Sequence, residues 1–173
     1  MPSRGDRFHI GLLLVIWLVI CATFSARIAR ADIDEKDLKE VKVTLQDALK
    51  ATEALGTPIS AKFEVEDGKL QLSVYTAKGD RFSEVIVDHR TGKVAKTEAI
   101  TSGDDLKAAE EQSAAIGKAK GKGSLRAAVT KVLATIKGAR AVSVLAKLDG
   151  GQPVAEITLL KGGNGQVFRQ RLD

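Results

Sequence analysis

The sequence has very little of the residue types from which most catalytic and metal sites are built. It contains 1 cysteine, 1 methionine, 1 tryptophan and 2 histidines, and Met1, Trp17 and Cys21 all precede residue 31. The rest of the chain has no thiol, so its fold must rest on packing rather than on disulfides. It also has one histidine, His89, and zinc would need further ligands that only carboxylates could supply. We therefore expect no metal site.

The patterns of other catalytic and cofactor sites are also missing. No serine stands in a nucleophile-elbow sequence. The glycines at 121–124 and 161–166 lack the strand, helix and Lys-Ser/Thr ending of a phosphate loop. From residue 32 onward, 23 basic and 21 acidic residues are interspersed, and such a balance steers weakly toward nucleic acid or anionic lipid. We therefore expect no catalytic residues, no cofactor and no nucleic-acid partner, that is, a protein that is not an enzyme.

The N-terminal segment 1–31 has the three parts of a secretory signal. Arg4 and Arg7 precede an apolar run from 10 to 24, and Ala29 and Ala31 have the spacing of an A-x-A cleavage site. The apolar run is shorter than the roughly 20 residues that a membrane-spanning helix needs. We therefore expect a signal peptide at 1–31 and export through the inner membrane to the periplasm or beyond.

Two alternatives to cleavage remain open. Arg27 and Arg30 follow the apolar run, and basic residues there favour a retained anchor. In that case the protein would contact the membrane through its N-terminal segment only. Cys21 could be lipidated, although Ile20 stands where a lipidation motif has a small residue.

Two stretches have the apolar spacing of an amphipathic helix, and three strand-like segments follow each of them. Steps of three and four predict helices at 37–55 and 124–138. Period-two segments predict strands at 61–66, 69–77, 81–88, 140–148, 153–160 and 166–173. Matching elements recur at a nearly constant offset along the chain, as the turn sequence Asp67-Gly68 does at Asp149-Gly150. This recurrence indicates a tandem repeat.

The predicted fold is therefore α+β, with two repeated units joined by a helical segment. Each unit would pack one helix on its own three- or four-stranded antiparallel sheet. The first unit spans 32–100, the segment 101–123, and the second, truncated unit 124–173. The segment is either packed through its alanine stripe or solvated, and it either bends at its glycines or continues into the next helix.

Several residues are expected to shape turns. Gly56 is placed at a left-handed helix terminus, with Pro58 beyond it to stop the helix. Asp88 ends a strand and is expected to accept a hydrogen bond from a backbone amide two residues on, while Gly92 closes the turn with a positive φ. His89 would be solvated within this turn. Tyr75 and Phe82, which close and open strands, are placed in the core.

The order of these elements resembles the PepSY domain family over residues 38–98. The residues that carry the resemblance are Gly56, Pro58 and Ile59, then Glu64, Glu66, Asp67 and Gly68, then Val87, Asp88, Thr91, Gly92 and Val94. The second unit matches in pattern only, because it lacks the Asp-x-x-Thr-Gly ending. The resemblance implies a small, non-catalytic α+β module of bacterial secreted and membrane proteins. The family also occurs in the propeptides of secreted metallopeptidases, which implies inhibition or folding assistance of peptidases.

We therefore expect a secreted or periplasmic binding or regulatory protein. Its partner would be another protein, with a secreted peptidase as the candidate that it modulates or inhibits. The alternative is a structural or adaptor protein of the cell envelope that contacts another subunit through its sheet edges.

Overall fold

The computed structural model describes residues 33–121 and 123–172, which form three helices and seven strands. In chain order these are α1 (Leu45–Thr52), β1 (Thr57–Glu66), β2 (Lys69–Lys78), β3 (Arg81–Val87), β4 (Val94–Ile100), α2 (Gly103–Lys118), α3 (Leu125–Thr135), β5 (Arg140–Asp149), β6 (Gln152–Lys161) and β7 (Asn164–Arg171).

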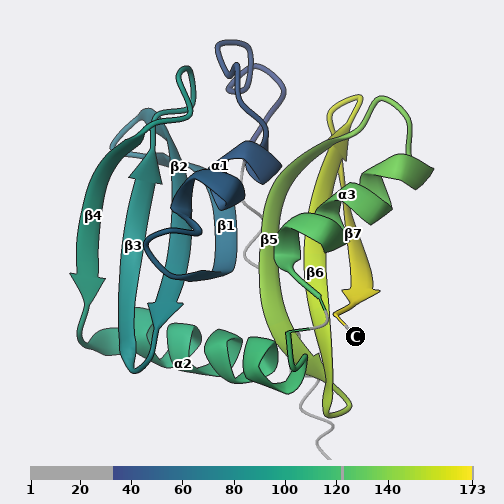
Figure 1. The fold of residues 1–173 in the computed structure, drawn as a ribbon. Coiled ribbons are helices and arrows are strands. Elements are labelled where there is room, and N and C mark those ends of the chain that lie inside the picture. The colour runs from purple at the N-terminus through teal and green to yellow at the C-terminus, as the bar shows by residue number, and fades with distance from the viewer. Residues whose placement is uncertain (1–32, 122, 173) are drawn as a thin grey trace, which may run out of the picture.

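All seven strands belong to one antiparallel sheet with the order β4-β3-β2-β1-β5-β6-β7 (Figure 1). The α+β class is therefore confirmed. The expectation of a separate three- or four-stranded sheet for each unit is wrong, because β1 and β5 pair with each other at the centre. Their short ladder joins Ser60 to Leu145, Ala61 to Val144, and Lys62 to Ser143.

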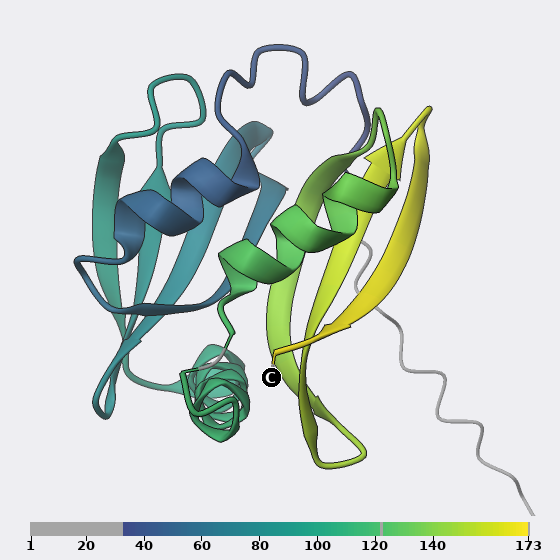
Figure 2. The same ribbon diagram turned by 45° about the vertical axis from the view of Figure 1, so that its right-hand side comes forward.

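Helices α1 and α3 lie beside each other on one face of the sheet, which we call the helix face (Figure 2). Side chains alternate between the two faces along a strand, so one set of strand residues points toward these helices. One hydrophobic core results, with members from both halves of the chain. Its largest fully buried side chains include Leu45, Leu49, Phe63, Leu72, Val74, Leu125, Ile157 and Leu159.

The first helix is shorter than its apolar spacing predicts, beginning at Leu45 rather than near residue 37. A capping box fixes this start: the Thr44 hydroxyl accepts from the Asp47 amide at 3.1 Å, and the Asp47 carboxylate accepts from the Thr44 amide at 2.8 Å. A hydrogen bond from the Thr44 hydroxyl to the Asp47 carboxylate at 2.7 Å, and then the bond from the Thr44 amide, hold the pKa of Asp47 below its usual range. Leu38 and Val41, which continued the spacing, lie before the helix and are nevertheless buried in the core.

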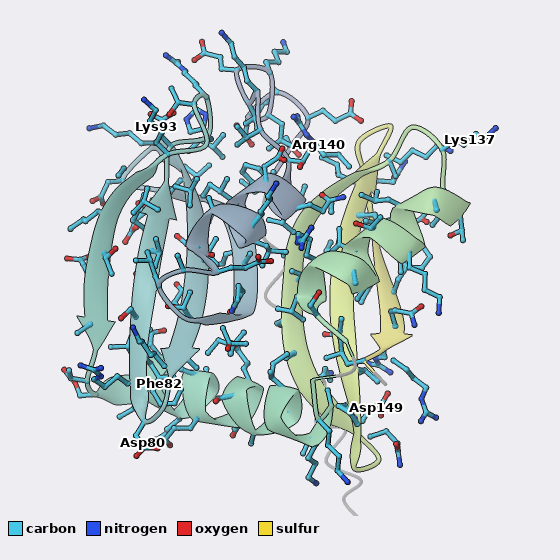
Figure 3. All side chains as sticks on the ribbon, viewed as in Figure 1. Asp80, Phe82, Lys93, Lys137, Arg140 and Asp149 are labelled. Carbon is cyan, nitrogen blue, oxygen red and sulfur yellow. The ribbon has the colours of Figure 1, made fainter. Side chains whose placement is uncertain are left out.

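The segment before α1 connects the two halves of the molecule. On β5, the Arg140 guanidinium donates to the carbonyl oxygens of Leu38 and Val41, both at 3.1 Å (Figure 3). Nearer the N-terminus, the Glu35 carboxylate accepts from the Gly163 amide at 3.0 Å, in the turn between β6 and β7. The early residues are therefore tied to the last three strands.

Helix α2 runs along one end of the sheet (Figure 1) and is packed there. Ala109, Ala115 and Ala119 are at most 2% exposed, and Ala109 shares a small second cluster with Ile59 and Phe82. Of the two possibilities left open for 101–123, the packed helix is therefore correct. It does not continue into the next helix, because α2 ends at Lys118 and α3 begins at Leu125.

The expected signal peptide at 1–31 lies outside the described residues. Within residues 33–121 and 123–172, no helix is both long and apolar enough to cross a membrane.

Candidate functional site

Gly56 and Pro58 do not end the first helix, as we expected, but have other structural roles. Helix α1 ends at Thr52, and Gly56 has no positive φ. A Cβ on Gly56 would instead come within 2.8 Å of the Ala77 carbonyl oxygen on β2, so this position needs glycine because two backbones approach closely. Pro58 lies inside β1, where the register with β2 shifts between Pro58 and Ser60, and such irregularities tolerate proline in a sheet.

Asp67 and Gly68 form the turn between β1 and β2. Their φ angles are 49° and 73°, and Glu66 pairs with Lys69 on either side of them. Two successive positive φ angles characterise the tight turn that suits the twist of a hairpin. The role of Asp67 and Gly68 is therefore to form the turn of the hairpin.

The loop from Asp88 to Gly92 is built around one carboxylate oxygen. Oδ1 of Asp88 accepts from the amides of Arg90 and Thr91, at 2.9 and 2.7 Å, and from the Thr91 hydroxyl at 3.0 Å. Gly92, with φ of 73°, donates its amide to the Asp88 carbonyl oxygen at 2.8 Å. Hydrogen bonds from the amides of Thr91 and Arg90 lower the pKa of Asp88.

This loop holds the segment that leads into α1. The carbonyl oxygen of His89 accepts from the amides of Lys42 and Val43, at 3.0 and 3.3 Å, and Arg90 pairs with Glu40. The expectation of a solvated His89 is wrong: its ring is half-buried, and its Nδ1 is buried with no hydrogen-bond partner among the described residues. The loop thus fixes the segment before α1 through hydrogen bonds and an ion pair.

Replacing Asp88 by alanine should lower the melting temperature at neutral pH and matter less in acid. The carboxylate's pKa is lowered in the folded state, so its stabilisation is present above the unfolded value of about 3.9 and is lost as pH falls through the folded value. Thermal melts of the parent and the variant at pH 7 and near pH 3 test this. Comparing the two proteins at the same pH cancels the titration of the other acidic groups, which both proteins share. A difference in melting temperature that stayed constant with pH would show that the charge of Asp88 is unimportant.

One hollow lies on the open face, which is the sheet face opposite α1 and α3. It is a groove of about 410 Å³ between α2 and strands β1, β2 and β5. A second hollow of about 460 Å³ shares Ala108, Gln112 and Leu145 with it and continues to Leu148. Because they share these lining residues, the two hollows adjoin along α2, and we call them together the α2 groove.

One wall of the α2 groove is polar and internally paired. Lys62 on β1 forms an ion pair with Glu64 at 2.6 Å, and its ammonium lies 5.6 Å from the centre of the Tyr75 ring. Glu64 also accepts from the Ser73 hydroxyl at 2.9 Å. The opposite side, from α2 and β5, presents the apolar and neutral polar side chains of Ala108, Ala109, Gln112, Ser143 and Leu145, together with the carboxylate of Asp105.

Tyr75 links this wall to the next strand. Its hydroxyl donates to Glu84 at 3.1 Å, and burial, then the negative charges of Glu84 and Glu64, strongly raise its pKa. The hydroxyl therefore stays protonated and serves as a hydrogen-bond donor rather than a base. Tyr75 is half-buried and lines the groove, whereas Phe82 is in the core as expected.

The lining of the groove combines apolar, neutral polar and charged side chains. Lys62 and Glu64 form an ion pair, and Asp105, Glu111 and Lys147 also line the groove. The described residues contain no group of three or more His, Cys, Asp or Glu that could hold a metal ion. Sequence reasoning missed this site because the polar residues alternate along strands and look like a solvated face. The alanine stripe of 104–120 was the one usable signal.

The comparison with protein families matches the part of the chain that contains α1, β1 to β4 and the Asp88 loop. Residues 42–98 match the family model described as peptidase propeptide and YPEB domain, or PepSY. A crystal structure described as that of a putative lipoprotein from Clostridium difficile 630 is similar, at 16% identity, over 78% of this chain and 97% of that one, with a TM-score of 0.37. The comparison with curated proteins gave no match. Residues 42–98, which hold α1, β1 to β4 and the Asp88 loop, are therefore a PepSY domain.

Proposed function

We propose that this chain is an exported, non-enzymatic regulatory protein that binds another protein, a secreted peptidase, through the α2 groove. The observation that carries the proposal is the groove itself, in which one wall holds the ion pair of Lys62 and Glu64 and the other side mixes apolar and polar residues. Sites of this mixed character favour binding, since apolar surface supplies affinity and a few placed polar groups supply specificity.

The shape and contents of the groove fit an extended peptide segment. The side formed by α2 and β5 offers the apolar Leu145 and Ala108, while Gln112 and Ser143 offer side-chain donors and acceptors for a peptide backbone. Tyr75 adds a flat ring whose far end is held by Glu84. A loop or terminus of a peptidase, laid along α2, would bury these groups without any change in the sheet.

The family supports this class of partner and location. Its description includes peptidase propeptides, which act on the peptidase to which they are attached, and a separate chain could act on a peptidase in trans. Export follows from the expected signal at 1–31 and places the protein in the periplasm or outside the cell, where secreted peptidases are found. An uncleaved N-terminal segment would anchor it there.

A second candidate function is supported by the edge of the sheet. Strand β4 is exposed along almost all of its length, and a free edge offers unpaired backbone groups to another chain. An envelope adaptor that binds another subunit through this edge would use a surface separate from the α2 groove.

We also propose that residues 32–100 and 124–173 are two units of one repeat. Three observations support this. Strands β5, β6 and β7 begin at one constant offset in the chain from β1, β2 and β3 respectively. The ladder β5–β6 shifts register between Ala141 and Ser143, and the ladder β1–β2 does so between Pro58 and Ser60, at the same offset. Each set of strands follows a helix that packs on the same face.

Inhibition of secreted peptidases tests the function directly. The purified protein should inhibit at least one member of a panel of such peptidases, and Gln112→Arg, which places a long charged side chain in the groove, should weaken inhibition by roughly tenfold or more, the effect of about 1.4 kcal/mol. Gln166→Arg makes the same change on exposed β7 and should have no effect. No inhibition of any peptidase, or equal loss in both variants, would reject the groove as the binding site.

A further inference from the structure

Strand β4 has a sequence that is complementary to itself when read in the opposite direction. It reads Val-Ala-Lys-Thr-Glu-Ala-Ile from Val94 to Ile100. A two-fold axis at Thr97 would place Lys96 opposite Glu98, alanine opposite alanine, and Val94 opposite Ile100. Because antiparallel pairing joins residues on the same face, this arrangement keeps the sheet continuous across the axis.

The strand is also open to a partner. Six of its seven residues are exposed and Ile100 is half-buried, and among the described strands β4 pairs only with β3. Natural edge strands are commonly protected by unpaired charge, proline or bulges. Here Lys96 and Glu98 neutralise each other at 2.7 Å, and the one bulge, at Ala95, lies outside the three central pairs.

The charges select one register. Sliding the two strands by two residues would set Lys96 against Lys96 or Glu98 against Glu98, and like charges directly opposite each other are destabilising. A slide by one residue would place the open face of one copy on the same side as the helix face of the other. Pairing centred on Thr97 therefore remains as the favourable alignment.

The neighbouring strand adds a second reason for a basic group at this edge. Glu84 on β3 lies directly opposite Glu98 in the β3–β4 ladder, an unfavourable pair of like charges. The ion pair with Lys96 of its own strand balances one of these two carboxylates, and a second copy would add its own Lys96 opposite Glu98, which would offset the other.

The other edge of the sheet does not share this property. Strand β7 contains Arg169 and Arg171 and no acidic residue, so no register of self-pairing could bring opposite charges together. Arg169 is also occupied by Glu156 at 3.0 Å. The two edges of one sheet are thus chemically different.

From this self-complementarity we propose that the protein forms a homodimer in which the β4 strands of two copies pair antiparallel about Thr97, extending the sheet across both copies. The dimer does not depend on the α2 groove, because α2 and β4 use different surfaces. It deepens the second candidate function by naming the subunit at the free edge as another copy of this chain.

Charge reversal tests the dimer. Sedimentation velocity over a concentration series, on the exported protein as cells produce it, should show a monomer–dimer equilibrium. Lys96→Glu and Glu98→Lys should each weaken it by about tenfold or more, because two attractive cross-strand pairs become repulsive. An equimolar mixture of the two variants should form a heterodimer, since one copy then presents two acidic and the other two basic side chains.

Gln166→Glu, on the opposite edge, is the control and should leave the equilibrium unchanged. A protein that stays monomeric at every concentration would overturn the proposal, as would a dimer that both charge reversals leave intact or variants that fail to associate when mixed. Each variant is checked by its thermal melt, and peptidase inhibition by the variants separates the dimer from the groove: loss of the dimer alone should leave inhibition intact.

Discussion

Fragments 32–101 and 102–173, expressed separately, are expected to be molten, while the intact chain unfolds in one cooperative step. The cut breaks the β1–β5 ladder and divides the hydrophobic core, whose members come from both halves. It also removes Arg140 from the Leu38 and Val41 carbonyl oxygens. Domains of this size bury only about 60% of their unfolded surface and are marginal without disulfides or metal.

The measurement is a thermal melt of each fragment beside the intact chain, followed by a melt of the equimolar mixture. Mixing should restore structure, because the two halves meet through a ladder and a packed interface. A second cut after Gly121 keeps α2 with the first half and shows which half its contacts stabilise more. Two fragments that each unfold cooperatively near the midpoint of the parent would show independent domains.

Replacing Phe63 by alanine is expected to cost about 3–5 kcal/mol of the free energy of unfolding. Phe63 is fully buried and lies on β1, the strand that pairs with both β2 and β5. Such a loss is a large share of the roughly 5–15 kcal/mol that stabilises an ordinary protein, so the midpoint of urea unfolding should fall far below that of the parent.

Val65→Ala is the matched control for this substitution. Val65 is two residues further along β1, on the same face, but it is 49% exposed, so the change should be within about 0.5 kcal/mol. Urea titration of both variants compares them. Similar losses at the two positions would mean that burial on β1 does not govern stability.

Much of the fold could be predicted because the local signals were strong. The alternation of apolar residues located six strands, and the turns at Asp67-Gly68 and at Asp88 to Gly92 lie between strands. The start of the first helix could not be predicted from apolar spacing. Leu38 and Val41 have the spacing of a helix, but they are buried in the core from a segment that is not helical. The Thr44 cap was the overlooked signal.

The single sheet and the site were beyond sequence reasoning for a different reason. Joining β1 to β5 depends on residues that lie far apart in the chain, and nothing local in Ser60 or Leu145 reveals that pairing. The α2 groove combines Lys62, Tyr75 and Gln112 from three elements. Each looks like an ordinary surface or core residue until the helix is placed across the end of the sheet.

In-cell crosslinking tests the central claim, binding of a peptidase in the α2 groove, most directly. A photoreactive residue at Gln112, inside the groove, and another at Lys131, exposed on α3, would be introduced separately into the exported protein. The account predicts that position 112 captures a secreted peptidase, that position 131 does not, and that the purified protein inhibits the peptidase so captured. Capture of no peptidase from position 112, or equal capture from both positions, would contradict it.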